Sequence, residues 1–334
     1  MVASQTELAP SPNALPEVAC LEAYWASHVA GGMRLQQMLE KVLLDTLGLG
    51  NQQVLAKLHG EHPNFGQFCD WILATVGMPD PALLARYHAW LLGDDPEAGA
   101  RALPDRIAGM PDVLDEAALR HWDDHGYVVL HDAISADERA AVRALIWEEI
   151  GGDPHDPASW YAPRPDGIMI TRFQHTALEA ARRSPRIHKA FAQLWGTADL
   201  WVTIDRIGFN PPERPGHPFA GSDLHWDVSL AQPIPFGTQA VLYLEDTAAD
   251  QGAFRCVPGF HRRIDGWLDG LGEPDPRRID LSAEQVHVAG KAGDLIIWRQ
   301  DLPHGASPNL SDKPRLAQYL NFYSPDMVVR ERWR

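Results

Sequence analysis

A change of sequence pattern near residue 198 limits the folds open to this chain of 334 residues. Beyond it, helical spacing nearly disappears, and short runs rich in β-branched and aromatic residues alternate with Gly, Pro and Asp. The predicted strands are LWVTIDRIGFN (200–210), DLHWDVSL (223–230), TQAVLYLED (238–246), GAFRCVP (252–258), QVHVAG (285–290), DLIIWRQ (294–300) and LAQYLNFYS (316–324). Many short strands favour a sandwich or barrel, and a double-stranded β-helix, or jelly roll, is the simplest choice.

The N-terminal third of the chain has a different pattern. Residues 1–17 are rich in Ser, Pro and Ala, which predicts a flexible tail. The pattern then becomes helical and predicts an N-terminal helical region over 18–105. The stretch 94–112, rich in Pro, Gly and Asp, predicts a domain boundary or a linker. We therefore expect a jelly-roll domain over 111–334 that is mainly β with flanking helices.

The flanking helices of this domain have recognisable start signals. A strand is predicted at GYVVLHD (126–132), and a helix follows it. Ser135 and Glu138 are spaced as a capping box for that helix. A second helix is predicted over 184–196, where Ser and Pro open the segment.

The composition excludes some classes of partner. A net charge of −16 argues against nucleic acid, because binding phosphates requires Lys and Arg. No run of 18 apolar residues predicts a membrane span, and no signal peptide is evident. The 3 cysteines are far apart and form no disulfide or zinc pattern. We expect a cytoplasmic protein without a membrane partner; the oligomeric state stays open, with a homodimer as one alternative.

An imidazole and a carboxylate stand two residues apart in the predicted strand 223–230, at His225 and Asp227. On a strand, such side chains project from the same face, so the two groups would share one small volume. The chain contains the same triplet at His121 and Asp123, where the surrounding apolar residues have helical spacing. On a helix the two side chains diverge by about 200°. We therefore expect only the downstream pair to act together.

Two further residues downstream complete a set of metal ligands and an anion partner. His304 comes just past the apolar strand 294–300, and Arg315 opens the next strand. Two histidines and one carboxylate leave three positions open on an octahedral metal, as in non-haem Fe(II) oxygenases. A nearby guanidinium can hold a carboxylate, here that of 2-oxoglutarate. A zinc hydrolase could use the same three ligands, but it would not explain the arginine.

The ordered combination of H-x-D, QGAFRCVPGFH (251–261) and GDLIIWRQDLPHGASPNLSDKPR (293–315) resembles the phytanoyl-CoA dioxygenase family. The resemblance covers roughly residues 111–327. It implies an Fe(II)- and 2-oxoglutarate-dependent oxygenase with a jelly-roll core, which consumes O2 and releases succinate and CO2.

The resemblance also implies roles for individual residues. It assigns iron to His225, Asp227 and His304, and the cosubstrate carboxylate to Arg315. Tyr243 falls where relatives carry an aromatic residue against 2-oxoglutarate.

The chain departs from the family after the distal histidine. Members often read H-G-S there, and the serine assists the cosubstrate carboxylate. Here His304 is followed by Gly305, Ala306 and then Ser307. Either Ser307 makes that contact or Arg315 works without it.

Four further residues are candidates for the substrate pocket. Trp226 and Trp298 lie close to the expected ligands in the sequence or in the adjoining strand. Arg172 and Arg206 precede the motif, and either could meet a substrate carboxylate. A salt bridge to one of the 45 acidic residues is the alternative for both arginines.

These expectations combine into one function. We expect hydroxylation of an unactivated C–H bond in a small metabolite, such as an amino-acid derivative or a natural-product intermediate. Asp227 favours hydroxylation over halogenation, because related halogenases carry a small residue at this position. Desaturation or cyclisation by an oxygenase of the same class stays open, as does a jelly-roll binding module without catalysis.

Overall fold

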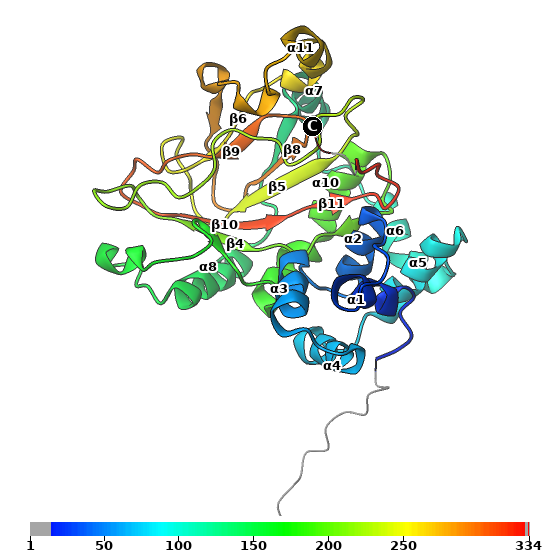
Figure 1. The fold of residues 1–334 in the computed structure, drawn as a ribbon. Helices are drawn as coiled ribbons and strands as arrows, with labels where there is room; N and C mark the ends of the chain where they lie inside the picture. Colours follow the sequence, from blue (N-terminus) through cyan, green and yellow to red (C-terminus); the bar gives the residue numbers. More distant parts are fainter. Residues whose placement is uncertain (1–14, 331–332, 334) are drawn as a thin grey trace, which may run out of the picture. The chain divides into compact units, whose positions relative to one another are not determined.

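The computed structural model describes residues 15–330 and 333, in two compact units that meet in sequence between Ala102 and Leu103 (Figure 1). The predicted tail over 1–17 falls mostly outside the described residues, which begin at residue 15. Within the described residues, no helix combines the length and apolar character that a bilayer crossing requires.

The first unit consists of short helices joined by tight turns. Its helices are α1 (Leu21–Val29), α2 (Gln37–Thr46), α3 (Asn51–Glu61), α4 (Phe65–Val76) and α5 (Pro81–Leu92). The side chain of Asp80 accepts hydrogen bonds from the backbone N–H groups of Ala82 and Leu83, which caps α5. Buried side chains such as Leu58, Phe68 and Ile72 line the inner faces of these helices. The helical prediction for this region agrees with the described structure.

The stretch predicted as a linker contains a helix, α6 (Ala98–Ala108), with Pro104 inside it. The two compact units divide within this stretch, but it is helical there rather than an open linker. A proline removes one backbone N–H and disfavours a helix interior. Here Ala, Leu and Arg, which are good helix formers, surround that proline and the helix continues past it.

The second unit is built on a six-stranded antiparallel sheet, ordered β1-β8-β5-β10-β4-β2. Its strands are β1 (Tyr127–Leu130), β2 (Met169–Ile170), β4 (Ile207–Asn210), β5 (Thr238–Tyr243), β8 (Leu295–Arg299) and β10 (Arg315–Leu320). A three-stranded sheet of order β7-β6-β9 contains β6 (Phe254–Cys256), β7 (Val286–Val288) and β9 (His304–Ala306). A two-stranded ladder pairs β3 (Trp201–Val202) with β11 (Phe322–Tyr323).

Helices cover one face of the six-stranded sheet. They are α7 (Glu116–His125), α8 (Ala136–Ile150), α9 (Thr176–Arg182) and α10 (Pro185–Trp195). Ile146 of α8 and Phe191 of α10 share one buried cluster with Leu242 and Ile297 of the sheet. The predicted capping box of Ser135 is present at the start of α8. Both flanking-helix predictions are therefore confirmed.

The opposite face of the same sheet packs against the three-stranded sheet. Val241 and Ile296 from the large sheet share a second buried cluster with Phe254 and Cys256 from the small one. In Figure 1, β6 and β9 are seen beside β5 and β8. Alternate residues of β5 and β8 therefore enter two different cores, which is the pattern expected of strands buried on both faces.

The predicted strand over 223–230 forms only a single bridge, between His225 and His304. The rest of this segment has no ladder partner. Two of its carbonyl groups instead accept hydrogen bonds from a side chain. The guanidinium of Arg277 donates to the carbonyl oxygens of Trp226 (2.8 Å) and Val228 (2.6 Å). The remaining elements are η1 (Pro157–Tyr161), η2 (Phe260–Arg262), α11 (Ile264–Leu271), η3 (Pro276–Arg278) and η4 (Ser282–Glu284).

Candidate metal centre

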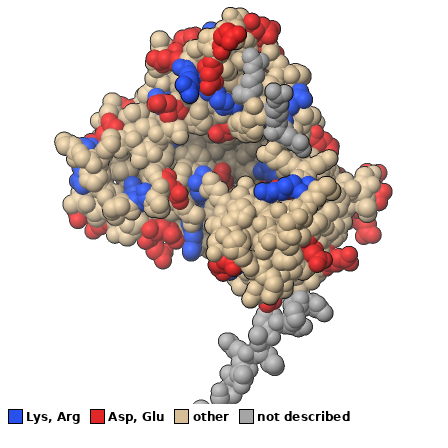
Figure 2. Space-filling view, in the orientation of Figure 1, with Lys and Arg blue, Asp and Glu red and all other residues tan. Residues whose placement is uncertain are grey.

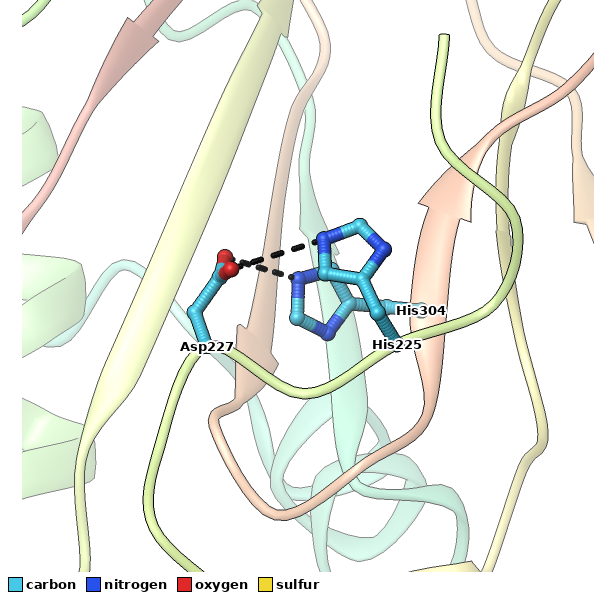
Figure 3. A group of neighbouring side chains, drawn as sticks. All are labelled: His225, Asp227 and His304. Carbon is cyan, nitrogen blue, oxygen red and sulfur yellow. Dashed lines mark hydrogen bonds and ion pairs between the residues drawn. The ribbon is translucent and has the colours of Figure 1, made fainter. Parts of the chain in front are cut away.

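Two neighbouring side chains and a third from a distant part of the sequence converge in the second unit. One ligand atom each from His225, Asp227 and His304 lies within 4.8 Å of the others, as Figure 3 shows. Asp227 Oδ1 is 3.5 Å from His225 Nε2, and Asp227 Oδ2 is 3.3 Å from His304 Nε2. In the described part of the chain, no other group of three such residues is close enough to hold a metal ion.

Local backbone pairing brings the two histidines together. The N–H of His225 donates to the carbonyl of His304 at 2.9 Å, and the reciprocal bond measures 3.0 Å. Gly305 permits this approach, because a Cβ there would lie 3.2 Å from the carbonyl oxygen of Asp223. Asp227 is two residues beyond the bridge, and its carboxylate faces both rings, as the i, i+2 spacing predicts.

Backbone carbonyls determine which nitrogen of each ring carries the proton. Nδ1 of His225 lies 2.7 Å from the carbonyl oxygen of Asp223, and Nδ1 of His304 lies 3.0 Å from that of Leu302. A carbonyl oxygen only accepts, so Nδ1 must be the donor in both rings. In the neutral imidazoles, the Nε2 lone pairs therefore point at the Asp227 carboxylate. Three acceptors that converge with no proton between them fit a divalent metal ion.

The protonation states of the pair also suit metal binding. Burial and the neighbouring His304 lower the pKa of His225 below its ordinary value. Burial raises the pKa of Asp227, but the neighbouring imidazole of His304 and the hydrogen bond from Gln239 outweigh this and hold the pKa below its usual range. At neutral pH the group therefore offers a neutral imidazole and an ionised carboxylate, the forms that bind metals.

The group is open to solvent on one side. The side chain of Asp227 is 53% exposed, whereas that of His304 is 4% exposed. The surface in Figure 2 is hollowed over β5, with acidic and basic side chains near the rim. Such an arrangement leaves coordination positions accessible to a second ligand.

Arg315 begins β10, as predicted, and is 1% exposed. Its Nη2 donates to the hydroxyl of Tyr319 at 3.1 Å, and no partner for its Nε is present among the described residues. A buried guanidinium without a carboxylate is costly unless another anion neutralises it. The donor set therefore fits the carboxylate of an anionic cosubstrate.

The two other residues expected at the cosubstrate use their hydroxyls elsewhere. The hydroxyl of Tyr243 donates to the carbonyl of Val288 at 2.9 Å and accepts from the N–H of Phe254 at 2.7 Å. Burial raises the pKa of Tyr243, and nearby Arg315 partly offsets this. The hydroxyl of Ser307 donates to the carbonyl of Ala253 at 2.8 Å. No hydrogen bond between Ser307 and Arg315 occurs in the described chain, so Ser307 does not join the guanidinium.

Tyr319 occupies the place beside Arg315 that Ser307 does not. It lies four residues beyond Arg315 on the same strand, and therefore on the same face. Gly208 on the neighbouring strand leaves room for its ring, because a Cβ there would lie 3.0 Å from the ring of Tyr319. The sequence analysis missed this residue; the i, i+4 spacing on a strand was the available signal.

The two tryptophans differ in position. Trp226 is 4% exposed and packs in the core with Phe260, and its indole donates to the carbonyl of Asp301 at 3.1 Å. It points away from its neighbour Asp227, which explains why it joins the core rather than the site. The ring of Trp298 packs against His304 with centroids 5.1 Å apart.

The two arginines proposed for substrate binding form ion pairs instead. Nε of Arg172 lies 3.3 Å from a carboxylate oxygen of Glu149, and Nε of Arg206 lies 3.6 Å from that of Asp205. The structure thus favours the salt-bridge alternative for both residues. Both arginines therefore have a counter-charge, whereas Arg315 has none among the described residues.

Comparison with known proteins gives one family match and distant relatives. Residues 122–317 match the family described as phytanoyl-CoA dioxygenase (PhyH). An ectoine dioxygenase of Bordetella parapertussis is 25% identical over 242 residues, which cover 65% of this chain and 78% of that protein. An ectoine dioxygenase of Nocardia farcinica is 23% identical over 237 residues, or 64% of this chain and 79% of that protein.

Solved structures show distant similarity as well. The crystal structure of EctD from S. alaskensis in its apoform has a TM-score of 0.49 and 20% identity, and covers 66% of this chain and 80% of that one. The family match spans more than half of the 334 residues. The chain therefore belongs to the phytanoyl-CoA dioxygenase family and is a non-haem iron dioxygenase that uses 2-oxoglutarate and O2.

Proposed function

We propose that this enzyme hydroxylates an unactivated C–H bond of a small metabolite and releases succinate and CO2. In this proposal His225, Asp227 and His304 bind Fe(II), and Arg315 binds 2-oxoglutarate. The observation that carries the proposal is the buried guanidinium of Arg315, which has no carboxylate partner among the described residues and lies in the same domain as the convergent ligand group. The bound iron couples oxidative decarboxylation of 2-oxoglutarate to oxidation of the substrate by O2.

The residues of this chain bind and orient the cosubstrate. Arg315 has N–H donors, among them Nε, available for a carboxylate, since its only hydrogen bond within the described chain is from Nη2 to Tyr319. Tyr319 accepts that bond, so its own proton is free to be donated to the same carboxylate. The phenol of Tyr243 already donates to Val288 and accepts from Phe254, so it holds its ring in place close to Arg315 and does not donate to the cosubstrate.

We place the catalytic residues in a jelly-roll domain over 111–334. The two packed antiparallel sheets of the second unit support this assignment. The helices of residues 18–105 then form a separate domain, in accord with the boundary at Ala102 and Leu103.

For the substrate, we propose an amino-acid derivative or a natural-product intermediate. Two relatives of this chain are named ectoine dioxygenase, which supports a small metabolite. Asp227 fills the coordination position that a halogenase would leave for halide, which favours hydroxylation. A complete ligand set, and an Arg315 whose Nε has no partner among the described residues, weigh against a binding module without catalysis.

The experiment is a metabolite screen that measures succinate formed from 2-oxoglutarate in air with added Fe(II). We expect the true substrate to stimulate succinate formation and to yield a product heavier by one oxygen atom. Asp227→Ala should abolish both signals because it removes a metal ligand. Asp123→Ala is the matched control, since Asp123 stands in the same H-W-D triplet but is exposed on α7.

Two outcomes would contradict the proposal. Unchanged product formation by Asp227→Ala would refute the ligand assignment. A wild-type protein that binds neither Fe(II) nor 2-oxoglutarate would refute the catalytic function as a whole. A product lighter by two hydrogen atoms would instead identify desaturation or cyclisation.

A further inference from the structure

A glutamine on the large sheet contacts the carboxylate of the metal centre. Gln239 is paired in register with Trp298 of the neighbouring strand β8. The indole Nε1–H of Trp298 donates to Oε1 of Gln239 at 3.1 Å. In turn, Nε2 of Gln239 donates to Oδ2 of Asp227 at 2.7 Å. A chain of two hydrogen bonds therefore connects the sheet to Asp227.

The chemistry of the indole determines the direction of this chain. An indole nitrogen can only donate, so the side of the Gln239 amide that faces Trp298 must be its oxygen. The amide nitrogen must then face Asp227. The Trp298 ring is itself held by Phe254, with centroids 4.3 Å apart. Gln239 is thus fixed as a donor toward the carboxylate.

Asp227 needs such support because its own segment provides little. It lies outside any strand, and its side chain is 53% exposed. Without a partner, the carboxylate could rotate and offer a metal either oxygen or both. The amide engages Oδ2 at 2.7 Å, whereas Oδ1 accepts no hydrogen bond from it. The two carboxylate oxygens are therefore not equivalent.

We propose that Gln239 is a positioning residue for the metal centre and that Trp298 acts through it. The pair holds the carboxylate of Asp227 so that one oxygen ligates Fe(II) while the other remains on the amide. This inference rests on the proposed ligand role of Asp227. One-oxygen ligation conserves the open coordination positions that 2-oxoglutarate and O2 require.

The test measures metal affinity rather than turnover. Anaerobic titration calorimetry gives the dissociation constants of Fe(II) and Co(II), and the visible absorption spectrum of the Co(II) protein reports the ligand geometry. Gln239→Leu should raise the dissociation constants of both metals by about 10- to 100-fold, the usual effect of losing a residue that hydrogen-bonds to a metal ligand. Trp298→Phe keeps an aromatic ring but removes the N–H, and should weaken binding by a smaller factor.

A matched control separates positioning from general stability. Gln318 is a buried glutamine of the same sheet, and its amide donates to the carbonyl of Leu178 on the helix-covered side. Gln318→Leu should leave metal affinity and the Co(II) spectrum unchanged. Combining Gln239→Leu with Trp298→Phe should weaken binding no more than Gln239→Leu alone, because the indole N–H acts only through the amide and phenylalanine keeps an aromatic ring beside His304.

The outcomes distinguish this inference from the proposed function. If the wild type binds Co(II) and Gln239→Leu binds it equally, with the same spectrum, the inference is wrong and the function stands. If the wild type binds no metal, the proposed function itself fails. Should Gln239→Leu not fold, Gln239→Glu and Trp298→Phe decide the matter; wild-type affinity and an unchanged spectrum in both would overturn the inference.

Discussion

In the site that we propose for the cosubstrate, the hydroxyl of Tyr319 lies beside Arg315. It already accepts a hydrogen bond from the guanidinium at 3.1 Å, and its proton is free for an anion. We predict that Tyr319→Phe raises the KM for 2-oxoglutarate by about 10-fold, the loss expected for one hydrogen bond to a charged group. The Fe(II) dissociation constant, measured anaerobically, should not change.

Arg315→Lys gives the comparison for this prediction. Lysine keeps the charge but cannot form two parallel hydrogen bonds to one carboxylate. The KM of Arg315→Lys for 2-oxoglutarate should therefore rise more than that of Tyr319→Phe. A Tyr319→Phe protein with the wild-type KM would show that the phenol only packs beside the arginine. A loss of metal affinity in the same variant would point to a structural role instead.

At the residue scale, some of the site follows from sequence alone and some does not. The i, i+2 spacing predicts that His225 and Asp227 face one point, and the strand start predicts the place of Arg315. Tyr319 could also have been found, from its i, i+4 spacing to Arg315 on one strand. Gln239 is different, because its role depends on which strands are neighbours and in which register. Periodicity along one strand carries no information about the partner strand.

At the element scale, the segment that carries Asp227 depends on Arg277 rather than on a strand ladder. The guanidinium donates to the carbonyls of Trp226 and Val228, on either side of Asp227. We predict that Arg277→Leu lowers the free energy of unfolding by about 1–3 kcal/mol, because two carbonyls lose a charged donor. It should also weaken Fe(II) binding. Chemical denaturation and anaerobic titration measure the two effects.

The adjacent arginine is a suitable control. Arg278 has an 87% exposed side chain that is paired with Asp275, so Arg278→Leu should alter stability by well under about 1 kcal/mol. Equal effects of the two substitutions would mean that Arg277 does not hold the segment.

The elements that the sequence predicted correctly carry local signals, and the exceptions depend on distant contacts. The helix start at Ser135 is an example, because the cap lies within the same few residues. The segment 223–230 has a strand pattern, yet two of its carbonyl groups accept hydrogen bonds from Arg277, which lies 51 and 49 residues further along the sequence. In 94–112, the Pro and Gly content predicted a boundary or linker, but the good helix formers between these residues allow a helix over Ala98–Ala108.

At the scale of the whole molecule, the acidic composition leaves no dominant basic face in the view of Figure 2, where both signs of charge are dispersed. The Pro-, Gly- and Asp-rich stretch 94–112 predicted a boundary or linker, and the two compact units divide within it. Their division falls inside α6 rather than in an open linker, because helix formation continues through the boundary.

The pH dependence of stability should reflect a buried imidazole in the helical unit. Burial, together with the neighbouring Arg34 and His59, lowers the pKa of His28 from 6.5 to about 4. Between these two values the unfolded chain binds a proton that the folded chain does not, so stability falls as the pH falls through this range. Above pH 6.5 both states are neutral at this site, and His28 has no effect on the pH dependence.

The neighbouring Glu40 has an opposite effect on stability in acid, because burial raises its pKa and the folded chain then takes up a proton before the unfolded chain does. Comparison of the wild type with His28→Gln, which keeps Glu40, therefore isolates the contribution of His28. We predict that the Tm of the wild type falls more steeply than that of His28→Gln as the pH is lowered from 7 to about 4. The difference between the two proteins should be constant above pH 7, because neither then takes up a proton at residue 28. Parallel Tm curves throughout the acid range would mean that His28 is protonated in the folded chain as readily as in the unfolded one.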